Sequence, residues 1–343
     1  MSKVLFLLRQ SNNYQYSNDE DVDNYNNNYY SSGLFNSVQY LVKLLTSLNI
    51  DVSYEEVFDS NSIDRVVTKL KSTLVILEAL WVPPSKLTVL SKLHKNITWV
   101  VRIHSELPFL ANDSIALDWM KQYENIDNVI LAVNSDRMVK DFQTILKKDL
   151  TYLPNYYVLD DFVVKKLNKR DEINIGCFGA VRPLKNQLLQ AVSAIKFANQ
   201  RNLKLNFYMN GSRQENNGTP VLNNIRNLFK GTNHNLIEIQ WLEHNNFLTF
   251  LNNNIDIGLQ VSFSETFNIV SADFIYCGIP IVVSEEIKFI TRQFKVKSTS
   301  VDNIVKKLNF IYDFDYVSFQ ALNYFKLKEF LTKVEKIWTK FVG

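Results

Sequence analysis

Strand-length apolar runs alternate with amphipathic segments along the first half of the chain. The apolar runs that predict strands are 3–8, 50–57, 74–77, 98–103 and 129–133. Between them, residues 33–48 and 63–71 have apolar positions at helical spacing. Strands that alternate with helices are typical of a parallel sheet covered by helices on both faces. The first half is therefore predicted to be a doubly wound α/β domain.

The same alternation restarts after a break at Leu153-Pro154-Asn155, where a proline and a turn-forming residue end a strand. Predicted strands follow at 173–178, 205–209, 237–241 and 255–261, with a helix at 184–199. We place an N-terminal domain at 1–155, a C-terminal domain at 156–318 and a helix at 319–343. This last helix is expected to cross back to the first domain, and packing on its own domain is the simpler alternative.

Length and composition agree with two soluble domains. The 343 residues suit two units of roughly 150 residues each. Hydrophobic residues make up 46% of the chain. The net charge is only +3 and the basic residues are scattered, so no long basic stripe indicates an anionic membrane or a nucleic acid as a partner.

Cys177 and Cys277 stand in apolar segments, which predicts buried thiols in a reducing compartment. Apolar runs are too short for a signal peptide or a membrane span, so we expect a cytoplasmic protein.

Residues 12–32 depart from this pattern. They form an Asn-rich stretch with five tyrosines and several acids, placed between the first predicted strand and the first predicted helix. Compact domains rarely contain so long a loop unless it is functional or disordered. Its tyrosines could stack on sugars or bases, whereas its acids would repel phosphate.

The segment 260–283 has the layout of a ligand site: strand, loop, helix, then Gly-x-Pro into another strand. In open α/β sheets, ligands bind outside the carboxyl ends of the strands, where helix N-termini offer N–H groups to phosphate. Glu265 is expected at or before the helix start, and Asp273 two turns on. Their carboxylates can accept hydrogen bonds from sugar hydroxyls, while the N–H groups of 267–269 can meet a diphosphate.

The run from Glu265, E-T-F-N-I-V-S-A-D-F-I-Y-C-G-I-P-I-V-V, resembles the E-x7-E signature of the large retaining GT-B glycosyltransferase family. The resemblance implies two Rossmann-like domains facing a central cleft. It also implies that Glu265 contacts the transferred sugar and that Asp273 binds the ribose hydroxyls. The residues implied to line the sugar and phosphates are Thr266, Phe267, Asn268 and Ile269. Thr266 and Asn268 replace two family glycines, and Asn268 is expected to substitute because asparagine tolerates left-handed backbone.

A second run, Phe178-Gly-Ala-Val-Arg-Pro-Leu-Lys-Asn186, resembles the family loop G-R-x-x-P-x-K-N, whose arginine and lysine clamp the diphosphate. Lys185 matches the family lysine. Ala180 stands at the arginine position, and Arg182, two residues later, is the candidate replacement. The alternative for Arg182 and Lys185 is ordinary surface charge.

Weaker resemblances lie in the first half. Gly33 resembles the family's glycine loop near the donor phosphates, and His104 its strand-end histidine. His104 would hold the donor sugar or orient the acceptor, so it joins Glu265 as a candidate catalytic residue; a structural histidine is the alternative. Three further residues are expected either to line the acceptor pocket or to be structural: Glu78, Trp81 and Glu106.

No metal or cofactor is expected besides the nucleotide sugar, which is a co-substrate. Asp21-Val-Asp23 and Asp313-Phe-Asp315 match the D-x-D pattern that binds a metal in a different glycosyltransferase fold. Neither follows the right kind of strand. Both are predicted to be solvated acids.

The resemblance implies transfer of a hexosyl or pentosyl group from a nucleoside-diphosphate sugar to an acceptor hydroxyl, with retention. A saccharide acceptor is favoured. Hydroxymethylated DNA is an alternative, because the composition and the run R-I-H-S-E-L-P-F-L resemble virus-encoded glycosyltransferases. A non-catalytic nucleotide-sugar-binding protein and a sugar-nucleotide epimerase are the other hypotheses. The oligomeric state is left open.

Overall fold

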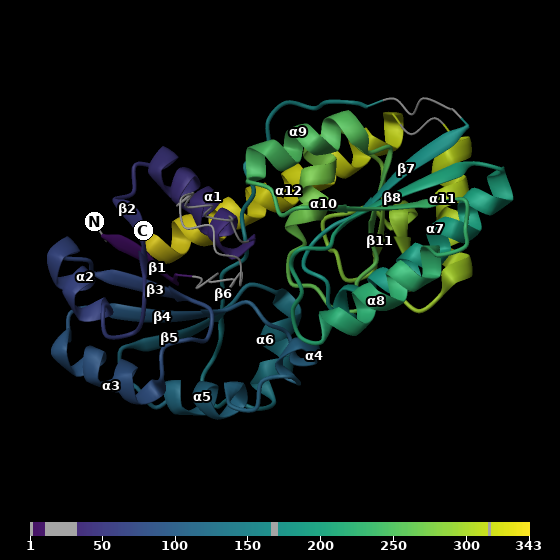
Figure 1. The fold of residues 1–343 in the computed structure, drawn as a ribbon. Coiled ribbons are helices and arrows are strands. Elements are labelled where there is room, and N and C mark those ends of the chain that lie inside the picture. Colours follow the sequence, from purple (N-terminus) through teal and green to yellow (C-terminus); the bar gives the residue numbers. More distant parts are fainter. Residues whose placement is uncertain (1–2, 11–32, 166–170, 315–316) are drawn as a thin grey trace, which may run out of the picture. The chain divides into compact units, whose positions relative to one another are not determined.

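The computed structural model describes residues 3–10, 33–165, 171–314 and 317–343. The chain divides into two compact units (Figure 1). Unit 1 contains Met1–His104, Ser114–Pro154 and Ile337–Gly343, and unit 2 contains Ser105–Asp113 and Asn155–Lys336. The unusual segment 12–32 lies outside the described residues.

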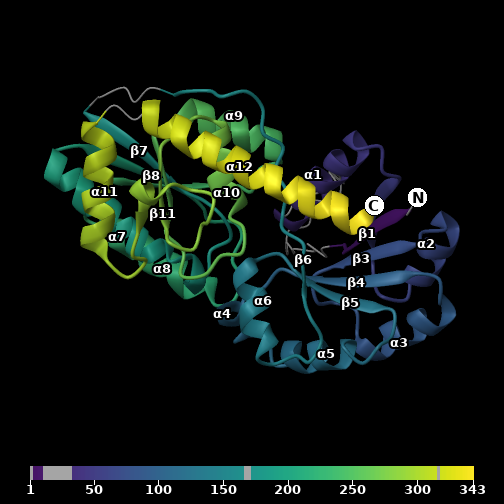
Figure 2. The same cartoon turned by 180° about the vertical axis from the view of Figure 1, so that it is seen from behind.

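Unit 1 is built on a parallel sheet of six strands in the order β2-β1-β3-β4-β5-β6. The strands are β1 (Val4–Arg9), β2 (Val52–Val57), β3 (Leu74–Glu78), β4 (Thr98–Ile103), β5 (Val129–Val133) and β6 (Thr151–Tyr152). The helices are α1 (Gly33–Ser47), α2 (Ile63–Leu70), α3 (Pro84–Leu93), α5 (Ala116–Tyr123) and α6 (Asp136–Gln143). In both views α3 and α5 lie on one side of this sheet and α1 on the other (Figures 1 and 2).

Unit 2 repeats the architecture with a parallel sheet in the order β12-β11-β10-β7-β8-β9. Its strands are β7 (Glu172–Cys177), β8 (Lys204–Asn210), β9 (Asn235–Ile239), β10 (Ile257–Gln260), β11 (Ile281–Ser284) and β12 (Lys295–Val296). Its helices are α4 (Leu107–Leu110), η1 (Pro183–Lys185), α7 (Gln187–Arg201), α8 (Gly218–Phe229), α9 (His244–Asn254), α10 (Ile269–Tyr276), η2 (Arg292–Phe294), α11 (Val301–Asp313) and most of α12 (Val317–Val342).

The central strands of both sheets are covered on both faces. All residues of β3 and β10 are buried, as expected where helices pack on both faces of a parallel sheet. The predicted fold of two doubly wound α/β domains is confirmed.

Cys177 and Cys277 are buried free thiols, and burial raises the pKa of each to about 12. In the described part of the chain, no helix combines the length and apolar character of a membrane span.

Helix α12 begins in unit 2, but its last residues belong to unit 1. Trp338 explains this assignment, because its fully buried indole packs on Phe6 of β1, with ring centroids 5.7 Å apart. Its Nε1–H donates to the carbonyl of Pro154 at 2.8 Å. The helix therefore crosses back to the first sheet, and the change of unit along the chain falls between Pro154 and Asn155.

Candidate functional site

An ion pair joins two loops at the carboxyl edge of the unit 2 sheet. Lys185 ends the 3₁₀ turn η1 after β7, and Glu265 lies in the loop between β10 and α10. The Lys185 Nζ donates to Glu265 Oε1 at 2.5 Å, and the two side chains keep 13% and 8% of their surface exposed. The structure thus brings together two residues predicted from separate motifs.

Backbone geometry holds the Lys185 loop against the end of β10. Gly179 has φ +112°, a conformation that L side chains rarely adopt, and its N–H donates to Asn210 Oδ1. Asn186 is left-handed at φ 57°, and its amide donates to the carbonyls of Val261 and Ser298. These bonds fix Lys185 beside the loop that carries Glu265.

Asn268 is the N-cap of α10. Its backbone is extended, with φ −89°. Its Oδ1 accepts a hydrogen bond from the N–H of Ser271 at 2.8 Å. Its amide also donates to Gln260 Oε1 and to Glu265 Oε1. The expected left-handed backbone is therefore wrong: asparagine stands here because its side chain caps the helix and orients Glu265. Because α10 starts only at Ile269, Asp273 lies about one turn into the helix, not two.

Glu265 is an anion at neutral pH. Burial by itself would raise the pKa of its carboxyl, but the Lys185 ammonium, its hydrogen bond and the Arg182 charge together lower the pKa below its ordinary value. A carboxylate in this state accepts hydrogen bonds and does not act as an acid.

Arg182 lies close enough to act on Glu265 electrostatically, yet its hydrogen bond goes elsewhere. Its Nη1 donates to Glu215 Oε2 at 2.8 Å, and its guanidinium carbon lies 5.0 Å from the ring centroid of Phe109 on α4. Within the described ranges, its buried Nε has no hydrogen-bond partner. Arg182 is therefore held beside the ion pair with donor capacity to spare.

Two further contacts support the Glu265 loop. Glu106, 3% exposed, accepts the hydroxyl of Ser264 through Oε2 at 3.0 Å. The Phe267 ring packs on Phe289 and Phe330, with centroids 4.9 and 6.0 Å away. The Phe267 side chain thus packs on an aromatic cluster and is half-buried, as are Thr266 and Ile269.

Asp273 is 2% exposed and is tied to two residues that sequence reasoning missed. Tyr157 Oη donates to its Oδ1 at 2.8 Å, and His244 Nε2 lies 2.8 Å from the same oxygen. Tyr157 follows the turn at Pro154, and His244 begins α9. No motif links either one to Asp273 along the sequence.

His104 lies in unit 1, directly after β4. Its Nε2 contacts Glu78 Oε2, and its Nδ1 lies 3.0 Å from Asn134 Nδ2. Arg102 Nη1 donates to both Glu78 oxygens at 3.0 Å, and Glu78 and Arg102 are fully buried. Burial and the Arg102 charge lower the pKa of His104 despite Glu78, so the ring is neutral at pH 7. Both ring nitrogens are thus bonded within the protein.

Gly33 is the first residue of α1, also in unit 1. The roles predicted for Gly33 and His104 stay predictions. Of the D-x-D acids, Asp313 ends α11 and pairs with Arg201, whereas Asp315 and the pair at 21 and 23 lie outside the described residues. Among the residues with assigned structure, no group of three or more His, Cys, Asp or Glu side chains is arranged to hold a metal ion.

No protein-family model matches the chain, and no curated protein matches it by sequence. Several solved structures, in contrast, match the chain by their fold. The sucrose-phosphate synthase of Thermosynechococcus elongatus superposes with TM-score 0.72 at 12% identity, covering 99% of this chain and 98% of that chain. The N-terminal domain of the Candida albicans trehalose-6-phosphate phosphatase gives TM-score 0.69 at 10% identity, covering 100% and 97%.

The S. aureus protein TarM, in a complex with fondaparinux, α-GlcNAc-glycerol and UDP, gives TM-score 0.61 at 13% identity, covering 82% of this chain and 58% of that chain. At these identities the likeness is one of fold. The expected GT-B architecture is confirmed by these full-length matches.

Proposed function

We propose that the chain is a glycosyltransferase that moves a sugar from a nucleoside-diphosphate sugar to an acceptor hydroxyl. The observation that carries the proposal is the Lys185–Glu265 pair, set by Asn268 at the start of α10 and at the carboxyl edge of a parallel sheet. One structural neighbour is a synthase of a sugar phosphate, and another is solved with UDP. Both likenesses support a donor site at this edge.

In this proposal, Lys185 binds the diphosphate. An ammonium has three donors, so Lys185 can keep its bond to Glu265 and still donate to phosphate oxygens. Arg182 adds a second positive charge nearby, and its side chain keeps 20% of its surface exposed. Preorganised donors that stabilise the departing diphosphate lower the barrier of such a transfer.

Glu265 accepts hydroxyls of the transferred sugar, because its lowered pKa keeps it ionised. Asp273 holds the ribose. Among the described residues, Tyr157 and His244 both contact its Oδ1, so Oδ2 is the oxygen that we assign to a ribose hydroxyl. Retention of configuration is what the family resemblance implies. A saccharide is the favoured acceptor, and hydroxymethylated DNA is the alternative. His104 has less support as a catalytic residue, because protein groups occupy both ring nitrogens.

A second candidate function is nucleotide-sugar binding without catalysis. The observation that favours it is the arginine: Ala180 stands where the family has arginine, and Arg182 is engaged by Glu215. A binder would need Lys185 for affinity and yet release no nucleotide.

A turnover assay separates the two functions. The protein is incubated with a panel of UDP-, GDP- and ADP-sugars, with and without glycans or hydroxymethylated DNA, and released nucleotide is measured. We expect release with at least one donor, and a loss of roughly 10²–10³-fold in Lys185→Ala and Glu265→Ala. Lys196→Ala is the matched control, since Lys196 pairs with Asp302 at 2.7 Å on an exposed surface.

Wild-type rates in folded Lys185→Ala and Glu265→Ala variants would contradict the proposed site. Lys185-dependent binding of a nucleotide sugar, with no release under any acceptor, would instead establish the binding-only function.

A further inference from the structure

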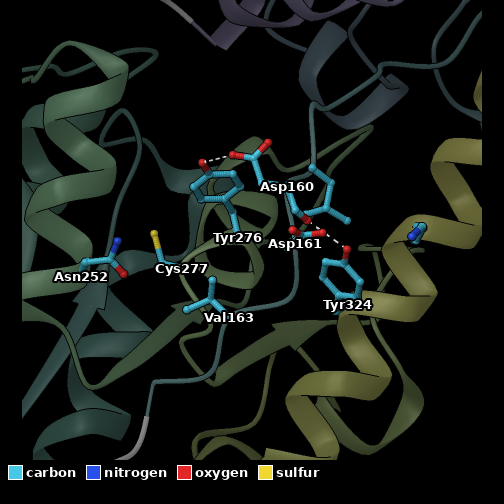
Figure 3. Close-up of a pocket in the computed structure, with 9 residues that line it drawn as sticks. Asp160, Asp161, Val163, Asn252, Tyr276, Cys277 and Tyr324 are labelled. Carbon is cyan, nitrogen blue, oxygen red and sulfur yellow. Dashed lines mark hydrogen bonds between the residues drawn. The ribbon is translucent and has the colours of Figure 1, made fainter.

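Unit 2 contains a pocket that the proposed chemistry does not use (Figure 3). Its volume is about 700 Å³. Its lining comes from the segment after Tyr157 and from α9, α10 and α12: Leu159, Asp160, Asp161, Val163, Asn252, Tyr276, Cys277, Tyr324 and Lys328.

The pocket lies at the end of α10 opposite to Glu265. Tyr157 connects it to Asp273, because Tyr157 bonds to Asp273 and its ring lies 6.2 Å from that of Tyr276. Tyr276 ends α10 and Cys277 follows it, whereas Asn268 and Glu265 stand at the other end of this helix. Eight residues of helix span about 12 Å. Neither Lys185 nor Glu265 is among the lining residues.

Two tyrosine rings are held in fixed positions at this pocket. Tyr276 Oη donates to Asp160 Oδ2 at 2.6 Å, and Tyr324 Oη donates to the Asp160 carbonyl at 2.9 Å (Figure 3). The bond to Asp160 and burial raise the pKa of Tyr276 to about 12, so its phenol stays neutral. The Tyr324 ring is buried and packs against Phe162 and Phe325. The half-buried Tyr276 ring is therefore the one that can present an uncharged face to a ligand, and its fixed orientation costs little further entropy on binding.

The wall formed by the end of α9 is also fixed in place. Lys165 Nζ donates to the carbonyls of Asn252 and Ile255 at 2.7 and 2.6 Å. These bonds satisfy carbonyls that would otherwise lack partners at a helix C-terminus. The Asn252 side chain is therefore carried on a rigid helix end, as in pockets that exist before their ligand binds.

The remaining polar side chains select the class of ligand. Asp161, Asn252 and Lys328 are exposed at the pocket, and together they supply carboxylate acceptors, an amide and an ammonium. Asp160 and Asp161 outweigh the single positive charge of Lys328, which disfavours phosphate and nucleotide. A ligand that combines hydroxyls for the carboxylate and amide with an apolar C–H face for a tyrosine ring fits this lining.

We propose that this pocket is a non-catalytic binding site for a neutral saccharide. Its use as an anchor for the acceptor or product glycan rests on the proposed function; saccharide binding itself does not. Asp161 and Asn252 bond to sugar hydroxyls, and the Tyr276 ring packs against the sugar.

The test is ligand-observed NMR and calorimetry on the full chain with maltotriose, chitotriose and xylotriose, with spermidine as a cationic probe. We expect at least one trisaccharide to bind. Asp161→Asn and Asn252→Ala should each weaken it by about tenfold, the loss of one good hydrogen bond. Tyr276→Phe, which keeps the ring, should bind more tightly than Tyr276→Ala. Asp302→Asn, at an exposed acid on α11, is the matched control and should bind normally.

Three results would overturn the proposal: no trisaccharide binds, binding survives unchanged in Asp161→Asn and Asn252→Ala, or spermidine alone binds and depends on Asp161. Lys185→Ala keeps the two proposals apart. Trisaccharide binding that persists in this variant belongs to the pocket, even where nucleotide release is lost or was never seen. Trisaccharide binding that disappears with Lys185 belongs to the donor site and contradicts the pocket.

Discussion

Glu78 in unit 1 and Glu265 in unit 2 are carboxylates in matching places with different surroundings. Each follows or ends a strand at the carboxyl edge of a parallel sheet, and each pairs with a cation. Arg102 and His104 enclose Glu78, and both it and Arg102 are fully buried. Lys185 and Glu265 both keep some exposed surface. The Glu78–Arg102 pair is closed to ligands, while the adjoining His104 side chain keeps 14% of its surface exposed. The Lys185–Glu265 pair has donor capacity left to offer a ligand.

The comparison shows that strand-end position alone does not identify a binding residue. Positive neighbours outweigh burial and lower the pKa of both glutamates, so ionisation does not separate them either. What separates them is whether their partners still have unused donors that a ligand can reach. Replacing each glutamate by glutamine tests this difference with the same chemical change.

Glu78→Gln should cause the largest loss of stability. It leaves the Arg102 charge fully buried without its carboxylate, and breaking a buried pair in this way costs about 3–5 kcal/mol. Urea unfolding of wild type and variant measures the cost. The double variant Glu78→Met, Arg102→Met should regain much of it, since both charges are gone. A single variant within about 0.5 kcal/mol of wild type, the range of ordinary surface changes, would mean that the cluster is not structural.

Glu265→Gln should affect activity more than stability. Its partner Lys185 keeps 13% of its surface exposed, so we expect a stability loss of about 1–3 kcal/mol, smaller than that of Glu78→Gln. Nucleotide release should fall about 10²-fold, because glutamine lacks the charge that strengthens a bond to a sugar hydroxyl. Urea unfolding and the release assay on the same preparation give both numbers. Stability losses as large as that of Glu78→Gln would erase the distinction between the two clusters.

Asn268→Ala should have a smaller effect, about 1 kcal/mol from the lost helix cap. Asn268→Asp keeps the capping oxygen and should lose less. Asn268→Gly decides between the cap and the left-handed backbone expected from the sequence, because glycine would stabilise a left-handed residue. Thermal unfolding of the three variants is the measurement, and a glycine variant more stable than wild type would contradict the cap.

The smallest effect concerns pH. The pKa of His104 is lowered in the folded protein, while an unfolded histidine titrates near pH ~6.5. As the pH falls below that value, the unfolded chain binds a proton that the folded protein does not, so stability decreases with falling pH. His104→Gln should show a flatter decline between pH 7.5 and 5.5 in urea titrations. An equal slope in the variant would remove His104 from the closed cluster.

The sequence predicted the two sheets well, because their central strands are continuous apolar runs between turn-forming residues. It missed α8 and α9, since Asn-rich segments weaken the helical pattern; α8 follows two left-handed residues, Asn216 and Asn217. Lys185 was found by its resemblance to a family loop, and Glu265 by the strand-loop-helix layout and the E-x7-E resemblance. Tyr157 and His244 were not, because only tertiary packing brings them to Asp273.

The most direct test of the donor site is calorimetric titration of wild type, Lys185→Met and Lys196→Met with UDP, GDP and ADP. The account predicts that at least one nucleotide binds wild type and Lys196→Met equally. Binding to Lys185→Met should be weaker by roughly 10- to 150-fold, which corresponds to the loss of about 1.5–3 kcal/mol from a charge-assisted bond. Equal affinity in all three proteins, or no binding of any nucleotide to wild type, would contradict it.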